Sequence, residues 1–201
     1  MTSQQRSEET YTRILEVAAA CFAERGYDAA SVAEICQRAG VSKGAFYYHF
    51  PTKQALFLRL LQGWLEGLDA RMVALSAAAA TVPDALLHMA VAFQDIFQPT
   101  DGQQLSIFLE FLRQAQRDPE VWEATIEPYR RYRELFATLI AAGIAEGSLR
   151  PVDPTMAAQH IVSLAVGLLV QSVLDPRGGD WGKVAQASIQ MLLAGLRQEY
   201  T

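Results

Sequence analysis

The 201-residue sequence predicts an all-α protein, and three observations support this fold class. No run alternates cleanly between apolar and polar residues, and no Asn-Gly or Asp-Gly pair separates β-branched segments, so strand signals are absent. Apolar residues instead recur at helical spacing. Capping and breaking residues punctuate these segments at regular intervals. About nine helices are expected, with no internal repeat.

The first three helices are predicted to be well delimited. Gly26 is expected to end the first, whose apolar residues are Ile14, Val17, Ala18, Cys21 and Phe22. Ser31 opens a Ser-Val-Ala-Glu capping box for the second helix, which Gly40 ends. Ser42 caps the third, and Pro51 terminates it because a residue before proline is disfavoured in the α region.

The later helices carry the same boundary signals. Thr52 is expected to cap a long helix that runs to about Leu75, and Pro83 suits the start of the next. The remaining signals are a turn at 99–102, helix starts at Asp118-Pro119 and Asp153-Pro154, an internal Pro128, a stop at Gly147, and a loop at 175–180 before the last helix.

Bulk composition is typical of a compact globular protein, with 51% hydrophobic and 19% charged residues. The N-terminus has no apolar signal region, and the longest apolar stretch, 161–174, is shorter than the roughly 20 residues that span a bilayer. A cytoplasmic protein without a membrane partner is therefore expected. Cys21 and Cys36 are expected to be buried free thiols, with a redox switch as the alternative.

The net charge of −5 disfavours nucleic-acid binding when it is taken alone, but the charge is unevenly distributed. Residues 1–60 hold seven Lys and Arg against six Asp and Glu. From Arg38 to Arg59 there are four cations and no acid. A local cationic window of this kind favours DNA binding.

This window contains a candidate helix-turn-helix, because two short helices flank Ala39-Gly40-Val41. In such a unit the second helix enters the major groove. Phe46 is expected to anchor that helix inward, so that small residues and two tyrosines face outward. Gly44 allows close backbone approach, and Ala45 can touch a thymine methyl. The predicted DNA-binding residues are Ser31, Ser42, Lys43, Gly44, Ala45, Tyr47, Tyr48, His49 and Lys53.

Each of these residues also has a structural interpretation. Ser31 and Ser42 can serve only as caps, and His49 can be a buried histidine without a metal. Tyr47 and Tyr48 are adjacent, so both cannot pack inward on so short a helix.

The segment Val32–Phe57, VAEICQRAGVSKGAFYYHFPTKQALF, resembles the N-terminal signature of the TetR family of bacterial regulators. The resemblance rests on the GVSKG core, the aromatic pair before His49-Phe50, and the Pro-Thr-Lys entry to the fourth helix. Cys36 departs from the pattern, where a small residue such as alanine is expected.

This resemblance implies a helix-turn-helix domain over residues 1–52 and a helical ligand-binding and dimerisation domain over 53–201. It also implies a repressor that binds a pseudo-palindromic, double-stranded DNA operator as a homodimer and is released by a small-molecule effector. The last two helices are expected to form the dimer interface, through Leu164, Leu168, Ala185, Ile189, Leu192 and Leu196. A second stripe on the last helix, Trp181, Val184, Met191 and Gly195, leaves the choice of face open.

The effector is expected to bind among the fifth to eighth helices, which are rich in aromatic residues. His160, Ser163 and Gly167 form a polar face that leaves space. The ligand-binding candidates are Phe93, Phe97, Phe108, Glu110, Trp122, Tyr129, Tyr132, His160, Ser163 and Gly167. For any polar member, a solvated face or a satisfied core hydrogen bond is the alternative.

Other functions find less support in the sequence. An enzyme is disfavoured because metal-ligand spacing, a phosphate-binding glycine loop and a nucleophile motif are all missing. No cofactor or metal is expected. The alternatives are an activator or a ligand-independent regulator of the same fold, or a helical ligand carrier that does not bind DNA.

Overall fold

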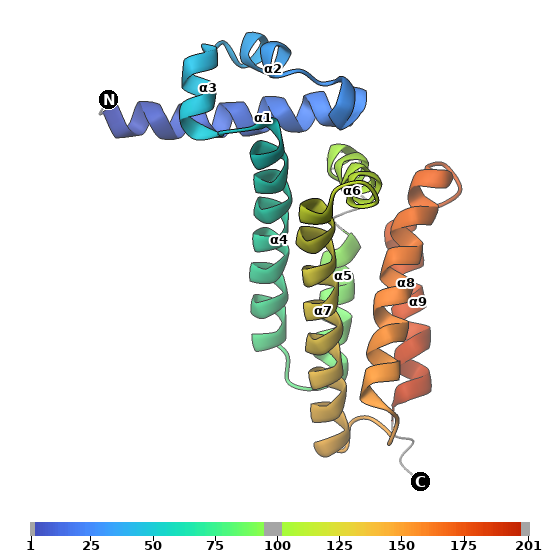
Figure 1. Ribbon diagram of the computed structural model, residues 1–201. Coiled ribbons are helices and arrows are strands. Elements are labelled where there is room, and N and C mark those ends of the chain that lie inside the picture. Colours follow the sequence, from blue (N-terminus) through green and yellow to red (C-terminus); the bar gives the residue numbers. More distant parts are fainter. Residues whose placement is uncertain (1–2, 95–101, 198–201) are drawn as a thin grey trace. The chain divides into compact units, whose positions relative to one another are not determined.

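The computed structural model describes residues 3–94 and 102–197, and the side chains of residues 4–90 and 106–197. The described residues form nine helices and no sheet, which confirms the predicted all-α class (Figure 1). The helices are α1 (Ser3–Ala29), α2 (Val32–Ala39), α3 (Lys43–His49), α4 (Lys53–Ala77), α5 (Val82–Gln94), α6 (Gly102–Ala115), α7 (Pro119–Ala145), α8 (Pro154–Leu174) and α9 (Trp181–Leu196).

The boundary signals act as expected at most helix ends. Gly26 interrupts α1 with a φ of 76° and a ψ of 165°, and Gly40 ends α2 with a φ of 64°. Glycine tolerates this left-handed region because it has no Cβ. Ser31 Oγ accepts the Glu34 N–H at 3.1 Å, but the Glu34 carboxylate pairs with Arg25 Nε at 3.1 Å. Half of the predicted capping box therefore forms, and its acid binds α1 to α2.

The chain divides into two compact units, and the first comprises residues 1–66 and 103–124. It contains α1–α3, the N-terminal half of α4, α6 and the start of α7. Its core is continuous from α1 to α7, and the largest fully buried side chains are Phe22, Phe46 and Phe57. Phe57 on α4 also contacts Phe111 on α6, with ring centroids 4.0 Å apart. The helix-turn-helix thus shares its core with α6.

The second unit comprises residues 67–102 and 125–201. It contains the rest of α4 and α7, together with α5, α8 and α9. Helix α5 packs against α9, and α8 lies beside α9 (Figure 1). The core includes Ile140 and Leu149, which are 0% and 1% exposed. The functional boundary predicted at residue 52 thus differs from the division into compact units.

Both cysteines are buried free thiols, as predicted. Burial raises the pKa of each thiol, because the charged thiolate is poorly solvated there. Among the described helices, α8 is long and apolar enough to cross a membrane by length and composition, with a mean hydropathy of 1.6. Core helices meet the same criterion, so this single helix is weak evidence for a membrane span.

Candidate DNA-binding face and ligand cavity

Helix α3 is held in place by a cap and two buried aromatic rings. Ser42 Oγ accepts the Ala45 N–H at 3.1 Å, which satisfies a backbone donor at the start of the helix. Phe46 is fully buried and Phe50 is 3% exposed. Phe50 stacks on Tyr11 of α1, with ring centroids 5.0 Å apart. These contacts fix the rotation of α3, so its opposite face is directed to solvent.

The solvent-facing side of α3 carries most of the predicted DNA-binding residues. Tyr48 is 79% exposed and Tyr47 is 52% exposed. Lys43 and Gly44 are exposed as well, whereas Ala45 is half-buried. The face thus presents one cation, two phenolic hydroxyls and a short stretch of bare backbone. Such groups can donate to phosphates and allow close approach to base edges.

His49, at the C-terminal end of α3, is half-buried between aromatic rings. Its ring lies 5.0 Å from Tyr48 and 5.8 Å from Tyr11, both in edge-to-face geometry. These contacts are consistent with the packing interpretation of His49. They are equally consistent with a phosphate contact.

Most cations of the acid-free window are paired in the folded unit. Arg38 forms a two-point pair with Glu24 of α1, at 2.8 and 3.0 Å. Arg59 donates from Nε to the Tyr11 hydroxyl at 2.8 Å and lies 3.3 Å from Glu66. Lys43 is exposed, and no carboxylate in the described part of the chain pairs with it. The window is therefore less cationic in space than in sequence.

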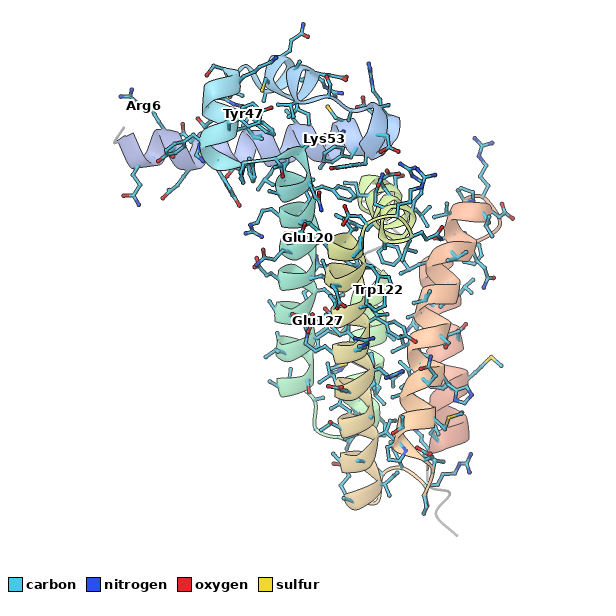
Figure 2. All side chains as sticks on the ribbon, viewed as in Figure 1. Arg6, Tyr47, Lys53, Glu120, Trp122 and Glu127 are labelled. Carbon is cyan, nitrogen blue, oxygen red and sulfur yellow. The ribbon has the colours of Figure 1, made fainter. Side chains whose placement is uncertain are left out.

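Lys53 has a structural role that the sequence reasoning missed. Its Nζ donates to the carbonyls of Tyr27 and Ala30, at 2.8 and 3.0 Å, and lies 4.3 Å from the centroid of the Tyr27 ring. Burial lowers the pKa of this amine, although the charges of Asp28 and Glu110 oppose the shift. Two of its three hydrogens are committed to these carbonyls, and the third is available to a phosphate. Lys53 fastens the end of α1 to α4 (Figure 2).

Two further residues, Ser31 and Arg6, are relevant to the candidate DNA-binding face. Ser31 is exposed, and its hydroxyl serves as the α2 cap. Arg6 was not among the sequence candidates, yet it is exposed near the N-terminal end of α1, on the side where α3 lies (Figure 2). The helix-turn-helix pattern did not predict a role for Arg6, because this residue lies outside the motif.

The second unit contains a cavity of about 50 Å³ lined by apolar side chains. Helices α4, α5, α7, α8 and α9 contribute its walls. The lining residues are Met72, Leu86, Met89, Ala90, Phe136, Ile161, Leu164, Ala165, Leu168, Ala185, Ile189, Leu192 and Leu193. Ligand sites are usually 300–1,000 Å³ in volume, so this cavity has to widen before it holds a drug-sized molecule. The flexible side chains of Met72 and Met89 suit such repacking.

Comparison with known proteins identifies the family. The model of the TetR family of bacterial regulatory proteins matches residues 14–60, and that of the BetI-type transcriptional repressor C-terminal region matches residues 83–198. The chain belongs to the TetR family. It is a DNA-binding transcriptional regulator.

Individual relatives agree over most of the chain. The regulator CymR of Pseudomonas putida is 30% identical over 190 residues, which are 94% of this chain and 92% of CymR. The A-factor receptor protein of Streptomyces griseus is 29% identical over 188 residues, 92% of this chain but only 63% of the receptor. A putative regulator from Saccharomonospora viridis, solved in complex with choline, superimposes with a TM-score of 0.83 at 24% identity, over 96% of this chain and 100% of that one.

In this TetR-family regulator, the predicted ligand-binding residues are divided between the two compact units. Phe97 and the side chain of Phe93 lie outside the described residues. Phe108 and Trp122 belong to the first unit, where Trp122 is 41% exposed. None of the eight predicted residues with described side chains lines the 50 Å³ cavity.

Three of the remaining candidates form hydrogen bonds within the second unit. Gln159 Nε2 donates to the Tyr129 hydroxyl at 2.9 Å and to Ser163 Oγ at 3.1 Å. The Tyr132 hydroxyl donates to Asp69 of α4. Burial raises the pKa of Tyr132 most, and this hydrogen bond raises it further. These polar groups therefore have partners within the protein, as the structural interpretation held.

Glu110 is buried and binds the broken end of α1. Its carboxylate accepts the Tyr27 N–H at 2.9 Å, a hydrogen bond from Gln114 at 3.1 Å, and two from Arg113. Burial opposes ionisation, but these hydrogen bonds outweigh it, so the pKa of Glu110 lies below its usual value. Its carboxylate is also 3.6 Å from where a Cβ on Gly26 would lie. Glu110 therefore couples α6 to α1 and is removed from the ligand candidates.

On α8, the side predicted to face the ligand is directed to solvent, and the side predicted to face the partner is directed inward. His160 and Ser163 are exposed, on the same stripe as Met156, Val170 and Leu174. His160 Nδ1 lies 2.7 Å from the Met156 carbonyl. Leu164 and Leu168 point to the other side and line the cavity. The residues assigned to ligand thus face outward, and those assigned to the partner face inward.

Helix α9 shows the same reversal. Ala185, Ile189 and Leu192 line the cavity, and Leu196 packs against the core of this unit. Val184 and Met191 are 39% and 77% exposed. Of the two stripes that the sequence left open, the Val184 stripe is the one directed to solvent. Of the two stripes, the Val184 stripe therefore has the side chains that are accessible to a partner.

Proposed function

We propose that this regulator is a repressor that binds a pseudo-palindromic operator as a homodimer and is released by an apolar small molecule, within the cytoplasm. The observation that supports operator binding best is the outward face of α3, where Tyr47, Tyr48, Lys43 and Gly44 surround a buried Phe46. A helical carrier that had lost DNA binding would have no reason to keep two exposed tyrosines.

The dimer is proposed to form through the exposed stripes of α8 and α9, here called the outer stripes. They are Met156, Val170 and Leu174 on α8, and Val184 and Met191 on α9. Several exposed large apolar residues on neighbouring helices favour an interface. A pair of α3 helices would then read two half-sites, separated by one helical turn of DNA or a multiple of it.

The effector is proposed to occupy the 50 Å³ cavity after it widens. The lining includes no charged side chain among the residues described and a single aromatic ring, Phe136. Such a lining favours an aliphatic or alicyclic molecule over a small cation such as the choline bound by the Saccharomonospora viridis protein. A tenfold to hundredfold loss of operator affinity needs about 1.4–2.8 kcal/mol of coupling, which is within the usual range.

DNA binding is tested by measuring affinity for the chain's own promoter region and for a random duplex, at two salt concentrations. Specific binding that weakens steeply with salt is expected, because each phosphate contact releases counterions. Equal affinity for both duplexes at each salt concentration contradicts the proposal.

Ligand release is tested by thermal-shift screening for a stabilising molecule, followed by titration with and without operator. Thermodynamic reciprocity requires that operator weaken ligand binding by the same factor by which ligand weakens operator binding. Identical ligand affinities in the two titrations would show that the protein binds DNA regardless of the ligand.

A further inference from the structure

A second and larger cavity lies within the first unit, among α1, α4 and α6. Its volume is about 340 Å³, against about 50 Å³ for the cavity of the second unit. The lining residues are Leu15, Ala19, Arg59, Leu60, Gly63, Trp64, Ile107, Phe108 and Phe111. Its volume alone places it in the range of ligand sites.

The walls of this cavity suit a flat apolar body. Trp64 and Phe108 form one wall, with ring centroids 5.7 Å apart and ring planes inclined by 43°. Phe111 is 2% exposed and extends the aromatic lining. An apolar cavity of roughly 150 Å³ is enough to bind benzene, so one of more than twice that volume can hold two rings.

Arg59 is the one charged group in this lining. Its Nε is held by the Tyr11 hydroxyl at 2.8 Å, and its guanidinium pairs with Glu66, which is 55% exposed. A pair with so exposed a carboxylate contributes little free energy, so an anion inside the cavity can displace Glu66. The Tyr11 bond fixes the guanidinium, which favours a directed interaction with a carboxylate or sulfonate.

We propose that this cavity is a second ligand site, which takes a two-ring aromatic molecule bearing one anionic group directed at Arg59. The site is distinct from the cavity of the second unit in both position and charge. It is formed by the same unit that carries α3. Its occupancy does not depend on whether the other cavity binds an effector.

Two fluorescent probes test this proposal on the full chain without DNA. Anilinonaphthalene sulfonate has a two-ring naphthalene that bears an anion, and it carries a further phenyl ring on its amine, whereas phenylnaphthylamine is the same molecule without the sulfonate. Both are expected to bind saturably to the unmodified protein. Absence of saturable binding by anilinonaphthalene sulfonate overturns the proposal.

Three variants locate the bound probe. Ala19→Leu and Gly63→Leu fill the cavity from α1 and from α4, and each should weaken both probes at least tenfold. Ala165→Leu is the matched control, since it fills the cavity of the second unit and should leave both affinities unchanged. Unchanged binding in both filling variants, provided their circular dichroism and melting temperature are native, overturns the assignment, as does loss of binding in Ala165→Leu alone.

Arg59→Gln tests the anionic group. It should weaken anilinonaphthalene sulfonate at least fivefold and leave phenylnaphthylamine unchanged. An equal effect on the two probes overturns the role of Arg59 as an anion partner. Because no DNA is present in these titrations, their failure leaves operator binding and release by the other cavity untouched.

Discussion

At the scale of single residues, the polar side chains differ in whether their hydrogen-bonding groups are still available to a partner. Tyr48 is 79% exposed, so its hydroxyl is available for a phosphate. Lys53 and Glu110 looked equally available in the sequence, yet both are bound to the end of α1. Glu110 and Tyr27 are separated by 83 positions, and no local pattern reports a contact over that distance. The sequence therefore predicts the exposed tyrosines better than it predicts the paired charges.

Tyr48→Phe is expected to weaken operator binding about tenfold for each α3 helix bound to DNA, because it removes one hydrogen bond of roughly 1.5 kcal/mol to a charged acceptor. The melting temperature should not change, since the side chain is so exposed. Fluorescence anisotropy with an operator duplex measures the effect. Val73→Ala, at another exposed apolar position, should change neither quantity, and native affinity in Tyr48→Phe would exclude a phosphate contact by the hydroxyl.

Glu110→Gln is expected to destabilise the protein in a pH-dependent way. Because the folded-state pKa of Glu110 lies below the unfolded value of about 4.3, its contribution is complete above about pH 5 and is lost as the pH falls through the folded-state pKa. The variant should be less stable than the unmodified protein at pH 7, and the gap should close on acidification.

Chemical denaturation at several pH values measures this gap in the free energy of unfolding. Asp28 shares Arg113 and also has a lowered pKa, chiefly because of that hydrogen bond, so the comparison uses the difference between the two proteins and not either curve alone. Glu123→Gln, at an exposed position on α7, is the control and should leave the free energy of unfolding at pH 7 unchanged. A constant gap between Glu110→Gln and the unmodified protein would show that ionisation of Glu110 contributes nothing.

At the scale of helices, the boundaries were predictable, whereas the inward faces of α8 and α9 were not. Ser42 and Asp153 cap α3 and α8 as the sequence predicts, because a capping hydrogen bond spans only two or three residues. The inward face of α8 could not be predicted in the same way. Its mean hydropathy is high over the whole length, so Leu164 and Val170 look alike until neighbouring helices are placed.

Gly143→Ala on α7 is expected to destabilise the protein by about 1–3 kcal/mol through overpacking. A Cβ there would lie 2.6 Å from Leu149 Cδ1 and 3.1 Å from Val82 Cγ1. Gly67→Ala on α4 is the matched control, with no described atom beyond its chain neighbours and the local helix backbone within 4 Å of the added Cβ, and should stabilise by about 0.5–1 kcal/mol. Thermal or urea unfolding measures both. Equal stability changes would contradict the close contact of α7 with Leu149.

At the scale of the whole molecule, α4 and α7 each contribute residues to both compact units. The boundary predicted at residue 52 followed the helix-turn-helix motif, which ends there in the sequence. Packing extends the first unit to Glu66 and adds α6, since Phe111 contacts Phe57. A contact between segments so far apart in the chain is a property of the assembled fold, and sequence periodicity does not specify it.

Assembly through the outer stripes makes a prediction for the intact protein. The pair Val184→Glu and Met191→Glu should convert a dimer to a folded monomer, because it buries charge in an apolar interface. Light scattering coupled to gel filtration measures the mass. Thr138→Glu, at an exposed position on α7, is the control and should remain dimeric. A dimeric mass in the double variant would place the interface elsewhere.

The exposure of the outer stripes also makes them sensitive to oxidation. Met191 and Met156 are 77% and 54% exposed, whereas Met72 and Met89 in the cavity wall are 7% and 3% exposed. Peroxide converts an accessible thioether to a polar sulfoxide, which disrupts apolar interfaces. Dimerisation should shield these two sulfur atoms, so the rate at which each sulfoxide forms, followed by mass spectrometry, becomes a measure of how long the two chains stay together.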